Sequence, residues 1–165
     1  FTSYLFVGTW GGDVFRSLDC GDHWEKVYTG DTSYPIGTLV IDPNADSNIY
    51  AGTCFGGGAI KSENLGQNWE AIGLDENYDS VTSIVVDPNH AKVLYAAKIV
   101  DGVFKSTDGG DTWDACNTGL TNTSVNVLAI DPMKNYIIAG TDKNTSGGGV
   151  FIRDFAKVFL PLITH

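Results

Sequence analysis

Carboxylates are the side chains of this sequence best suited to chemistry. Five of them lie in the stretches between β-prone runs: Asp31, Asp75, Glu76, Asp79 and Asp101. Two carboxyl groups about 5 to 9.5 Å apart can act as acid and base, or as acid and nucleophile, in glycoside hydrolysis. However, the chain has 20 acidic and 10 basic residues and a net charge of -10. Abundant acids in such a chain are weak evidence for catalysis.

The charge and the residue types argue against several other functions. An acidic chain repels phosphate backbones and anionic membranes, and no apolar run is long enough to span a bilayer. We therefore predict neither nucleic-acid binding nor membrane insertion. No Ser-His-Asp order, phosphate-binding loop or EF-hand loop is present. Because His23, His90 and His165 do not cluster and no Cys-x-x-Cys pair occurs, we predict no metal site and no cofactor.

The three cysteines, Cys20, Cys54 and Cys116, occupy different positions relative to the motifs described below. Because their number is odd, at least one is unpaired within the chain. We interpret them as structural thiols, with one disulfide as the alternative.

A turn motif of the form Ser-x-Asp-x-Gly-x-x-Trp recurs along the chain. Its Asp can accept hydrogen bonds from backbone N–H groups, its Gly adopts a conformation that other residues resist, and its Trp supplies burial. The serines are 62 − 17 = 45 and 106 − 62 = 44 residues apart. The copies, the second with Asn in place of Asp, are Ser17, Asp19, Gly21 and Trp24; Ser62, Asn64, Gly66 and Trp69; and Ser106, Asp108, Gly110 and Trp113. We interpret these residues as structural, with the acids holding turns and the tryptophans packing between repeats.

Two further markers keep the same spacing. An Asp-Pro pair ends an apolar run at Asp42, Asp87 and Asp131, which are 87 − 42 = 45 and 131 − 87 = 44 residues apart. A β-prone run begins at Leu5, Ile49, Leu94 and Ile137. A period in the mid-forties with several short strands is typical of the blade of a β-propeller. The sequence therefore predicts an all-β propeller of four-stranded antiparallel blades, about four of them in this chain.

The turn motif and its period resemble the Asp-box, or BNR, repeats of sialidases, sortilin-type receptors, xyloglucan-degrading glycosidases and photosystem assembly factors. The resemblance extends to about Ile152 and implies a propeller and an extracellular or periplasmic location. It does not imply one function, because these relatives include enzymes, receptors and assembly factors.

We expect a single domain over residues 1–165. Its repeats cover about residues 1–30, 36–73, 81–117 and 125–152, and the first repeat lacks an inner strand. No repeat explains the tail, residues 153–165. One hypothesis is that Val158 to Ile163 supplies the missing inner strand and closes the ring, and a short helix over residues 153–160 is the competing interpretation.

Four repeats can close in more than one way. The alternatives are a compact four-bladed ring, a symmetric homodimer in which two chains form one larger ring, or a piece of a longer polypeptide. We favour the first two, because an open array would expose apolar strands.

In a propeller, the loops before each inner strand share one face with the loops that join the second and third strands. We predict a ligand-binding face there, composed of Trp10, Asp31, Tyr34, Phe55, Asp75, Tyr78, Asp79, Asp101 and Asp142. Aromatic rings stack on sugars and also anchor protein partners, and carboxylates accept hydrogen bonds from hydroxyl groups. The predicted function is therefore a non-enzymatic binding or scaffold module for a glycan or a protein.

The alternative is a module related to the xyloglucan-degrading glycosidases, or a piece of one. The segments that carry the catalytic aspartates of those relatives are not found. Sialidases bind their substrate carboxylate with three arginines, whereas this chain has only Arg16 and Arg153. We therefore assign no catalytic residue.

Overall fold

The computed structural model describes residues 4–74, 79–142, 148–154 and 160–161, and every regular element in them is a β-strand. The strands form four antiparallel sheets, named here blades 1 to 4 in chain order. This confirms the prediction of an all-β protein built from antiparallel blades. No helix in the described part of the chain is long and apolar enough to cross a membrane.

Each blade is a meander in which consecutive strands pair. The strands of blade 1 are β1 (Leu5–Gly8), β2 (Val14–Ser17) and β3 (Glu25–Tyr28). Those of blade 2 are β4 (Ile36–Asp42), β5 (Ala45–Thr53), β6 (Ala59–Ser62) and β7 (Glu70–Ala71). Those of blade 3 are β8 (Val81–Val86), β9 (Leu94–Lys98), β10 (Gly102–Ser106) and β11 (Asp114–Ala115). Those of blade 4 are β12 (Val125–Asp131), β13 (Tyr136–Thr141), β14 (Val150–Asp154) and β15 (Leu160–Pro161).

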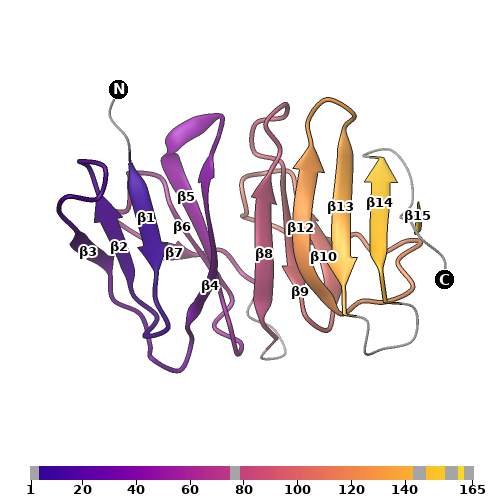
Figure 1. The fold of residues 1–165 in the computed structure, drawn as a ribbon, viewed down its shortest axis with the longest axis horizontal. Helices are drawn as coiled ribbons and strands as arrows, with labels where there is room; N and C mark the ends of the chain where they lie inside the picture. Colours follow the sequence, from indigo (N-terminus) through magenta and orange to yellow (C-terminus); the bar gives the residue numbers. More distant parts are fainter. Residues whose placement is uncertain (1–3, 75–78, 143–147, 155–159, 162–165) are drawn as a thin grey trace.

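The blades stand side by side in chain order, and blades 1 and 4 lie at opposite ends of the molecule (Figure 1). The inner strands β4, β8 and β12 of successive blades are neighbours, and β1, which corresponds to the second strand of the other blades, contacts β4. One chain therefore forms an open arc. Of the closures considered above, a four-bladed ring within one chain is not what the structure shows, because the two end blades are far apart.

The C-terminal tail belongs to blade 4. Ile152 is paired with Leu160, and Phe151 is paired with Pro161, so β15 is the outer strand of this blade. The hypothesis that the tail supplies the inner strand of blade 1 is therefore wrong, because the outer edge of β14 is nearby whereas blade 1 lies at the other end. A proline is compatible with this place, since an edge strand leaves one row of N–H groups unpaired. The competing helix is also wrong at its start, where β14 continues to Asp154; residues 155–159 lie outside the described residues.

The hydrophobic core lies between blades. One cluster joins blade 2 to blade 3 through Tyr50, Leu94 and Ala96, and another joins blade 3 to blade 4 through Tyr95 and Ala97. Successive residues of β9 thus face opposite neighbours, as the period of two in a strand requires. Every residue of β9 is buried, which explains why this strand is apolar almost throughout.

Candidate functional site

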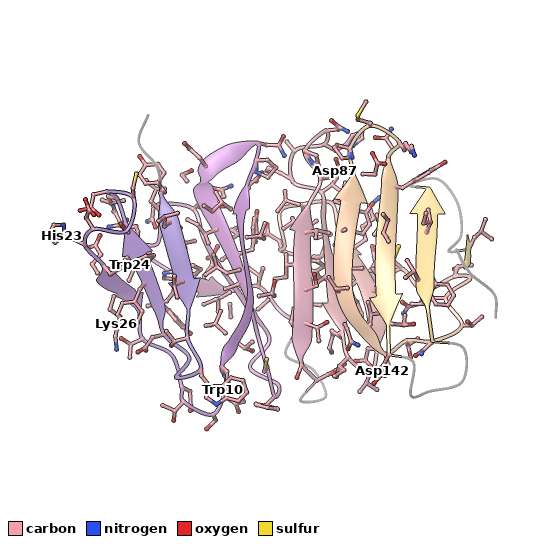
Figure 2. All side chains as sticks on the ribbon, in the orientation of Figure 1. Trp10, His23, Trp24, Lys26, Asp87 and Asp142 are labelled. Carbon is pink, nitrogen blue, oxygen red and sulfur yellow. The ribbon has the colours of Figure 1, made fainter. Side chains whose placement is uncertain are left out.

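Three exposed apolar side chains occupy equivalent loops at one end of the blades. Trp10 lies between β1 and β2, Phe55 between β5 and β6, and Val100 between β9 and β10, with 76%, 57% and 65% of their surfaces exposed. These three residues are called the tip row below. Trp10 lies at the same end of the molecule as Asp142, whereas Asp87 lies at the opposite end (Figure 2). The tip row belongs to the set of loops in which the sequence analysis placed its candidate ligand-binding residues, and binding at these loops stays a prediction.

Trp10 and Phe55 contact each other across the boundary between blades 1 and 2. Their ring centroids are 6.2 Å apart and the rings are nearly perpendicular, at 80°. Phe55 has a φ of 62°, a left-handed conformation that is unfavourable for a side chain of this size. Its N–H donates to Ser80 Oγ at 2.9 Å, which ties the loop to the segment that precedes blade 3. The fold thus holds an exposed aromatic pair in a strained loop, and such strain is commonly found at functional positions.

Asp31 and Tyr34 form the rim of the tip row between blades 1 and 2. Asp31 is exposed, and its Oδ1 accepts a hydrogen bond from the Ser33 N–H at 2.7 Å, which holds the pKa of this carboxyl below its usual value. Tyr34 is half-buried against Gly57, where an added Cβ would lie 2.7 Å from the tyrosine ring. Asp31 is therefore an available anion, and Tyr34 mainly supports the loop that carries Phe55.

Asp79 is a structural carboxylate. It is only 5% exposed, and its oxygens accept hydrogen bonds from the N–H groups of Ser80 at 2.7 Å, Val100 at 2.9 Å and Asp101 at 3.2 Å. These bonds hold the loop that presents Val100. A buried carboxylate engaged in this way is poorly placed to act as an acid or a base on an external substrate.

The remaining candidates of the predicted face have different environments. Asp101 accepts a hydrogen bond from the buried Lys98 ammonium at 2.9 Å. Asp142 is half-buried, and its backbone carbonyl accepts a hydrogen bond from the Asn122 amide at 2.7 Å. Asp75 and Tyr78 lie outside the described residues. The structure therefore brings Trp10, Phe55, Asp31 and Tyr34 together. Asp79 is not part of this group, because its carboxylate supports the loop that presents Val100.

The three motif turns share one hydrogen-bond pattern. In the first, the buried Ser17 Oγ accepts from the Gly21 N–H at 2.8 Å and donates to Asp19 Oδ1 at 2.8 Å, and Asp19 Oδ1 also accepts from the His23 N–H at 2.9 Å. The same contacts recur with Asn64 in the second turn and Asp108 in the third. The hydrogen bond from the His23 backbone is the main cause that lowers the pKa of Asp19 to about 2.

The motif tryptophans contact the preceding blade where the chain provides one. Trp113 donates its indole N–H to the Ile72 carbonyl of blade 2 at 2.9 Å. The Trp69 ring lies against Tyr28 of blade 1, with centroids 5.8 Å apart. Trp24 is 43% exposed at the outer edge of blade 1 (Figure 2). Blade 4 has no motif tryptophan; there Arg153 Nη1 donates to the Cys116 carbonyl of blade 3 at 2.8 Å.

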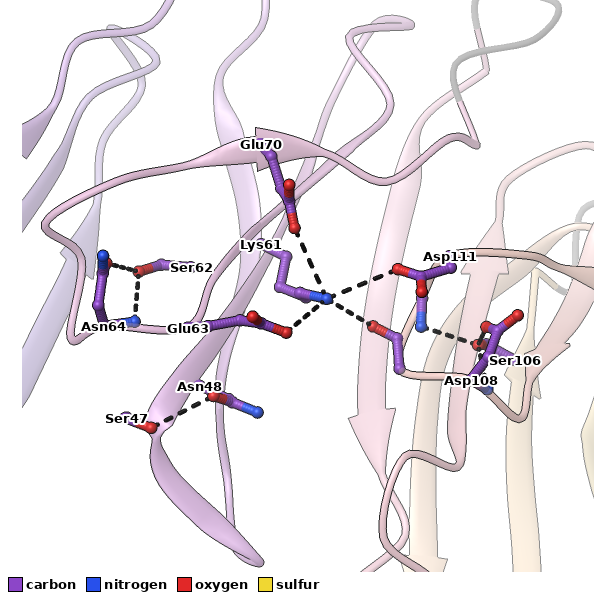
Figure 3. A network of polar contacts seen from close by, with 12 residues as sticks. Ser47, Asn48, Lys61, Ser62, Glu63, Asn64, Glu70, Ser106, Asp108 and Asp111 are labelled. Carbon is purple, nitrogen blue, oxygen red and sulfur yellow. Dashed lines mark hydrogen bonds and ion pairs between the residues drawn. The ribbon is translucent and has the colours of Figure 1, made fainter.

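Sequence reasoning missed a buried cation at the boundary between blades 2 and 3 (Figure 3). Lys61 Nζ lies 2.9 Å from Glu63 and 3.7 Å from Glu70 in blade 2, and 3.7 Å from Asp111 in blade 3. Its side chain is 5% exposed. Burial alone would lower the pKa of Lys61, but the hydrogen bond and charge of Glu63, together with the charge of Asp111, raise the pKa overall. The sequence does contain a signal for this cation. A basic residue precedes the motif serine in all three copies, as Arg16, Lys61 and Lys105.

The motif turns also border two small cavities on the outer edges of blades 1 and 2. Their volumes are about 260 and 240 Å³, and equivalent residues line them. The first is lined by Arg16, Leu18, Asp19, His23, Trp24 and Glu25, the second by Lys61, Glu63, Asn64, Asn68, Trp69 and Glu70. Neither cavity involves the tip row.

The described residues include no group of three or more His, Cys, Asp or Glu that could hold a metal ion. Cys20, Cys54 and Cys116 are all free thiols, so the alternative of one disulfide is not what the structure shows. Burial raises the pKa of both Cys54 and Cys116. A thiol that stays protonated is a poor nucleophile.

The chain is similar in structure to several solved propellers, although neither a family model nor a curated protein sequence matches it. An ancestral GH74 enzyme superposes with a TM-score of 0.77 at 20% identity, over 98% of this chain and 24% of that one. The GH74 xyloglucanase from Xanthomonas campestris gives 0.72 at 16% identity, over 93% and 27%. YCF48 bound to the D1 peptide gives 0.71 at 14% identity, over 98% and 50%.

These likenesses establish the fold. The chain consists of four blades of a β-propeller, and it spans about a quarter of the length of the GH74 chains that it matches.

Proposed function

We propose that this chain is a non-enzymatic binding module and that the tip row, together with Asp31, contacts a glycan. The exposed Trp10–Phe55 pair carries this proposal. Two large rings that face solvent are costly unless something covers them, and aromatic rings combined with a free carboxylate suit the C–H faces and hydroxyl groups of sugars. A protein partner anchored on the same rings is the other outcome considered.

The motif turns support membership of the Asp-box repeat family. The serine, the Asp or Asn, and the glycine of each copy make the same hydrogen bonds, which a shared turn motif requires. With this family we propose an extracellular or periplasmic location, where polysaccharides are accessible.

Binding of xyloglucan oligosaccharides, followed by calorimetry, tests the proposal. Trp10→Ala should weaken binding about tenfold or more, because aromatic contacts of this kind contribute roughly 1 kcal/mol or more beyond the area that they bury. Trp24→Ala is the matched control, since Trp24 is an exposed tryptophan away from the tip row. Equal loss of binding in both variants, or no binding to any member of a glycan array, would contradict the glycan proposal. Capture of a protein that depends on Trp10 would favour the protein partner.

A glycoside hydrolase module is the second candidate, and the superposition of 98% of this chain on an ancestral GH74 enzyme favours it. Among the described residues, Asp79 accepts hydrogen bonds from three backbone N–H groups and Asp101 accepts one from Lys98, whereas Asp31 is exposed and accepts one from the Ser33 N–H. Catalysis by this chain alone would need a second free carboxyl. The test is the release of reducing ends from xyloglucan by the wild-type chain and by Asp31→Asn. If the wild-type chain releases them and Asp31→Asn does not, the hydrolase proposal replaces the binding proposal.

A further inference from the structure

The first and third motif turns use both oxygens of their aspartate. One oxygen holds the turn, as described above. The second oxygen of Asp19 lies 2.6 Å from His23 Nδ1, and the second oxygen of Asp108 accepts a hydrogen bond from Thr112 Oγ1. In each of these turns the aspartate therefore contacts the side chain four residues later, and the contact stays within the turn.

The second turn lacks this contact, because asparagine stands at both positions. Asn64 Oδ1 accepts hydrogen bonds from Ser62 Oγ at 3.0 Å and from the Asn68 N–H at 2.9 Å. Within the described residues, the Asn64 Nδ2 group and the side-chain amide of Asn68 make no hydrogen bond. Both residues line the cavity of about 240 Å³ on the outer edge of blade 2. This cavity therefore contains amide donors and an amide acceptor that the turn itself does not use.

An indole ring and charged groups complete the lining of this cavity. Trp69 is half-buried, and its indole N–H donates to the Gly66 carbonyl at 3.0 Å, which orients the ring. Glu63 and Glu70 are exposed carboxylates that both pair with the buried Lys61 ammonium (Figure 3). The cavity thus combines an apolar ring, carboxylate acceptors and unused amide groups.

The equivalent cavity of blade 1 lacks this combination. Leu18 stands at the position of Glu63, and His23 stands at the position of Asn68. The His23 ring is held by Asp19, and none of the residues that line this cavity has an amide side chain. The two cavities have the same position in the motif and a similar size, but only the second has unused hydrogen-bonding groups of this kind. The first cavity therefore serves as a comparison within the same chain.

The size and the charges of the second cavity limit its ligand. Pockets for drug-sized molecules begin at about 300 Å³, so a cavity of about 240 Å³ suits a smaller molecule, of the size of one sugar ring. A pyranose has a C–H face that packs on an indole, and hydroxyl groups that both donate and accept. Glu63, Glu70 and Asp111 outnumber Lys61, so an anionic sugar would be repelled. Because Lys61 already supplies a cation to these carboxylates, the sugar needs no positive charge of its own.

We propose that the cavity of blade 2 binds one neutral pyranose unit. The amides of Asn64 and Asn68 hydrogen-bond to its hydroxyl groups, Glu70 accepts from them, and the Trp69 ring packs on its C–H face. This site goes beyond the proposed function and does not depend on it. The cavity belongs to the turn that follows β6, whereas Phe55 of the tip row lies in the loop that precedes β6, at the other end of the strand.

A titration followed by nuclear magnetic resonance tests this site. The probes are the methyl β-pyranosides of glucose, galactose, mannose and xylose, with methyl β-glucuronide as the anionic comparison. At least one neutral probe should cause saturable shifts of the side-chain amide signals of Asn64 and Asn68 and of the Trp69 indole signal. Absence of saturable shifts with all four neutral probes overturns the proposal. Equal affinity for the glucuronide would overturn the assignment to a neutral sugar.

Asn64→Asp separates binding from folding. It keeps the Oδ1 acceptor and restores the aspartate of the other two turns, so the melting temperature should not fall below that of the wild type. It also replaces the amide donor by a second carboxylate oxygen, and should weaken binding of the probe about tenfold. Asn68→Ala should weaken binding about threefold to tenfold, because the lost amide makes no contact within the turn.

His23→Ala is the matched control, since His23 is the equivalent of Asn68 in the first cavity, and the affinity for the probe should be unchanged. Saturable shifts that neither Asn64→Asp nor Asn68→Ala weakens overturn the proposal. Shifts that Trp10→Ala removes also overturn it, because the probe would then bind at the tip row. The tip row is tested through Trp10 and this cavity through Asn64 and Asn68, so failure of one proposal is distinguishable from failure of the other.

Discussion

The Asn44 side chain donates a hydrogen bond of 2.8 Å to the backbone carbonyl of Asp87, a residue of the next blade. Asn89 repeats the contact one blade later, with the Pro132 carbonyl at 2.7 Å. Both asparagines follow an Asp-Pro pair, and each preceding Asp accepts a hydrogen bond from the asparagine N–H at 2.8 Å. The Asp-Pro-Asn turn thus ends an inner strand and also holds the following blade.

Replacing Asn44 by Ala should lower the free energy of unfolding by about 1 kcal/mol, because the Asp87 carbonyl loses its donor. Urea unfolding followed by tryptophan fluorescence measures the change. The effects of Asn44→Ala and Asn89→Ala should not simply add in the double variant, because the Asp87 carbonyl accepts the Asn44 amide and the Asp87 carboxylate accepts the Asn89 N–H. Met133→Ala is the control at the equivalent exposed position, where no change in monomer stability is expected.

Lys61→Met should destabilise the protein by about 1–3 kcal/mol, because it leaves Glu63, Glu70 and Asp111 without their shared cation. The pKa of Lys61 is raised in the folded state, so its contribution is present below the ordinary value of 10.5 and is lost as the pH rises beyond it. Denaturant unfolding at pH 7 and above pH 11 should therefore show a smaller difference at the higher pH. An equally large effect of Lys134→Met, a change at an exposed lysine, would contradict a specific role for Lys61.

Asp19 should make the first motif turn sensitive to acid. Its folded pKa is lowered to about 2 from 3.8, so its stabilisation is complete above about pH 4 and is lost as the pH falls through 2. Asp19→Asn keeps the Oδ1 acceptor, as Asn64 does in the second turn, but loses the charge. Its melting temperature should therefore be lower than that of the wild type at pH 7, with a difference that disappears near pH 2.

Asp46→Asn serves as the comparison for this pH series, because Asp46 is an exposed aspartate with no hydrogen bond or ion pair in the described part of the chain. A difference between Asp19→Asn and the wild type that stays constant between pH 7 and pH 2 would contradict the electrostatic explanation.

Cys20→Gly should stabilise the first motif turn. Cys20 has a φ of 62°, and the equivalent residue of the third turn is Gly109, with a φ of 89°. Relief of this left-handed strain should raise the free energy of unfolding by about 0.5–1 kcal/mol, after the entropy cost of a glycine. Leu18→Gly in the same turn should have the opposite sign, since Leu18 has no positive φ. Thermal melting of both variants tests whether backbone conformation controls the stability of this turn.

Most of the strand pattern could be read from the sequence, because it depends on local chemistry. Gly21, Gly66 and Gly110 all adopt positive φ values, as the motif requires. Strand β15 was missed as an outer strand because only two of its residues pair, and no local pattern distinguishes such a strand from a tail. The repeat predicted that the loops carrying Trp10 and Phe55 are equivalent, but the sequence did not show that Asp79 is buried, where its carboxylate accepts hydrogen bonds from backbone N–H groups.

The sequence by itself determined the repeat, the blade and the turn chemistry, since each follows from residues that are close along the chain. Only the tertiary structure decided which equivalent residues are covered. Leu5 and Leu94 are alike in type and in register, yet one is 40% exposed and the other 0% exposed, because burial depends on the neighbouring blade. The same reason applies to Lys61, whose partner Asp111 lies 50 residues away and becomes adjacent only when blades 2 and 3 pack together.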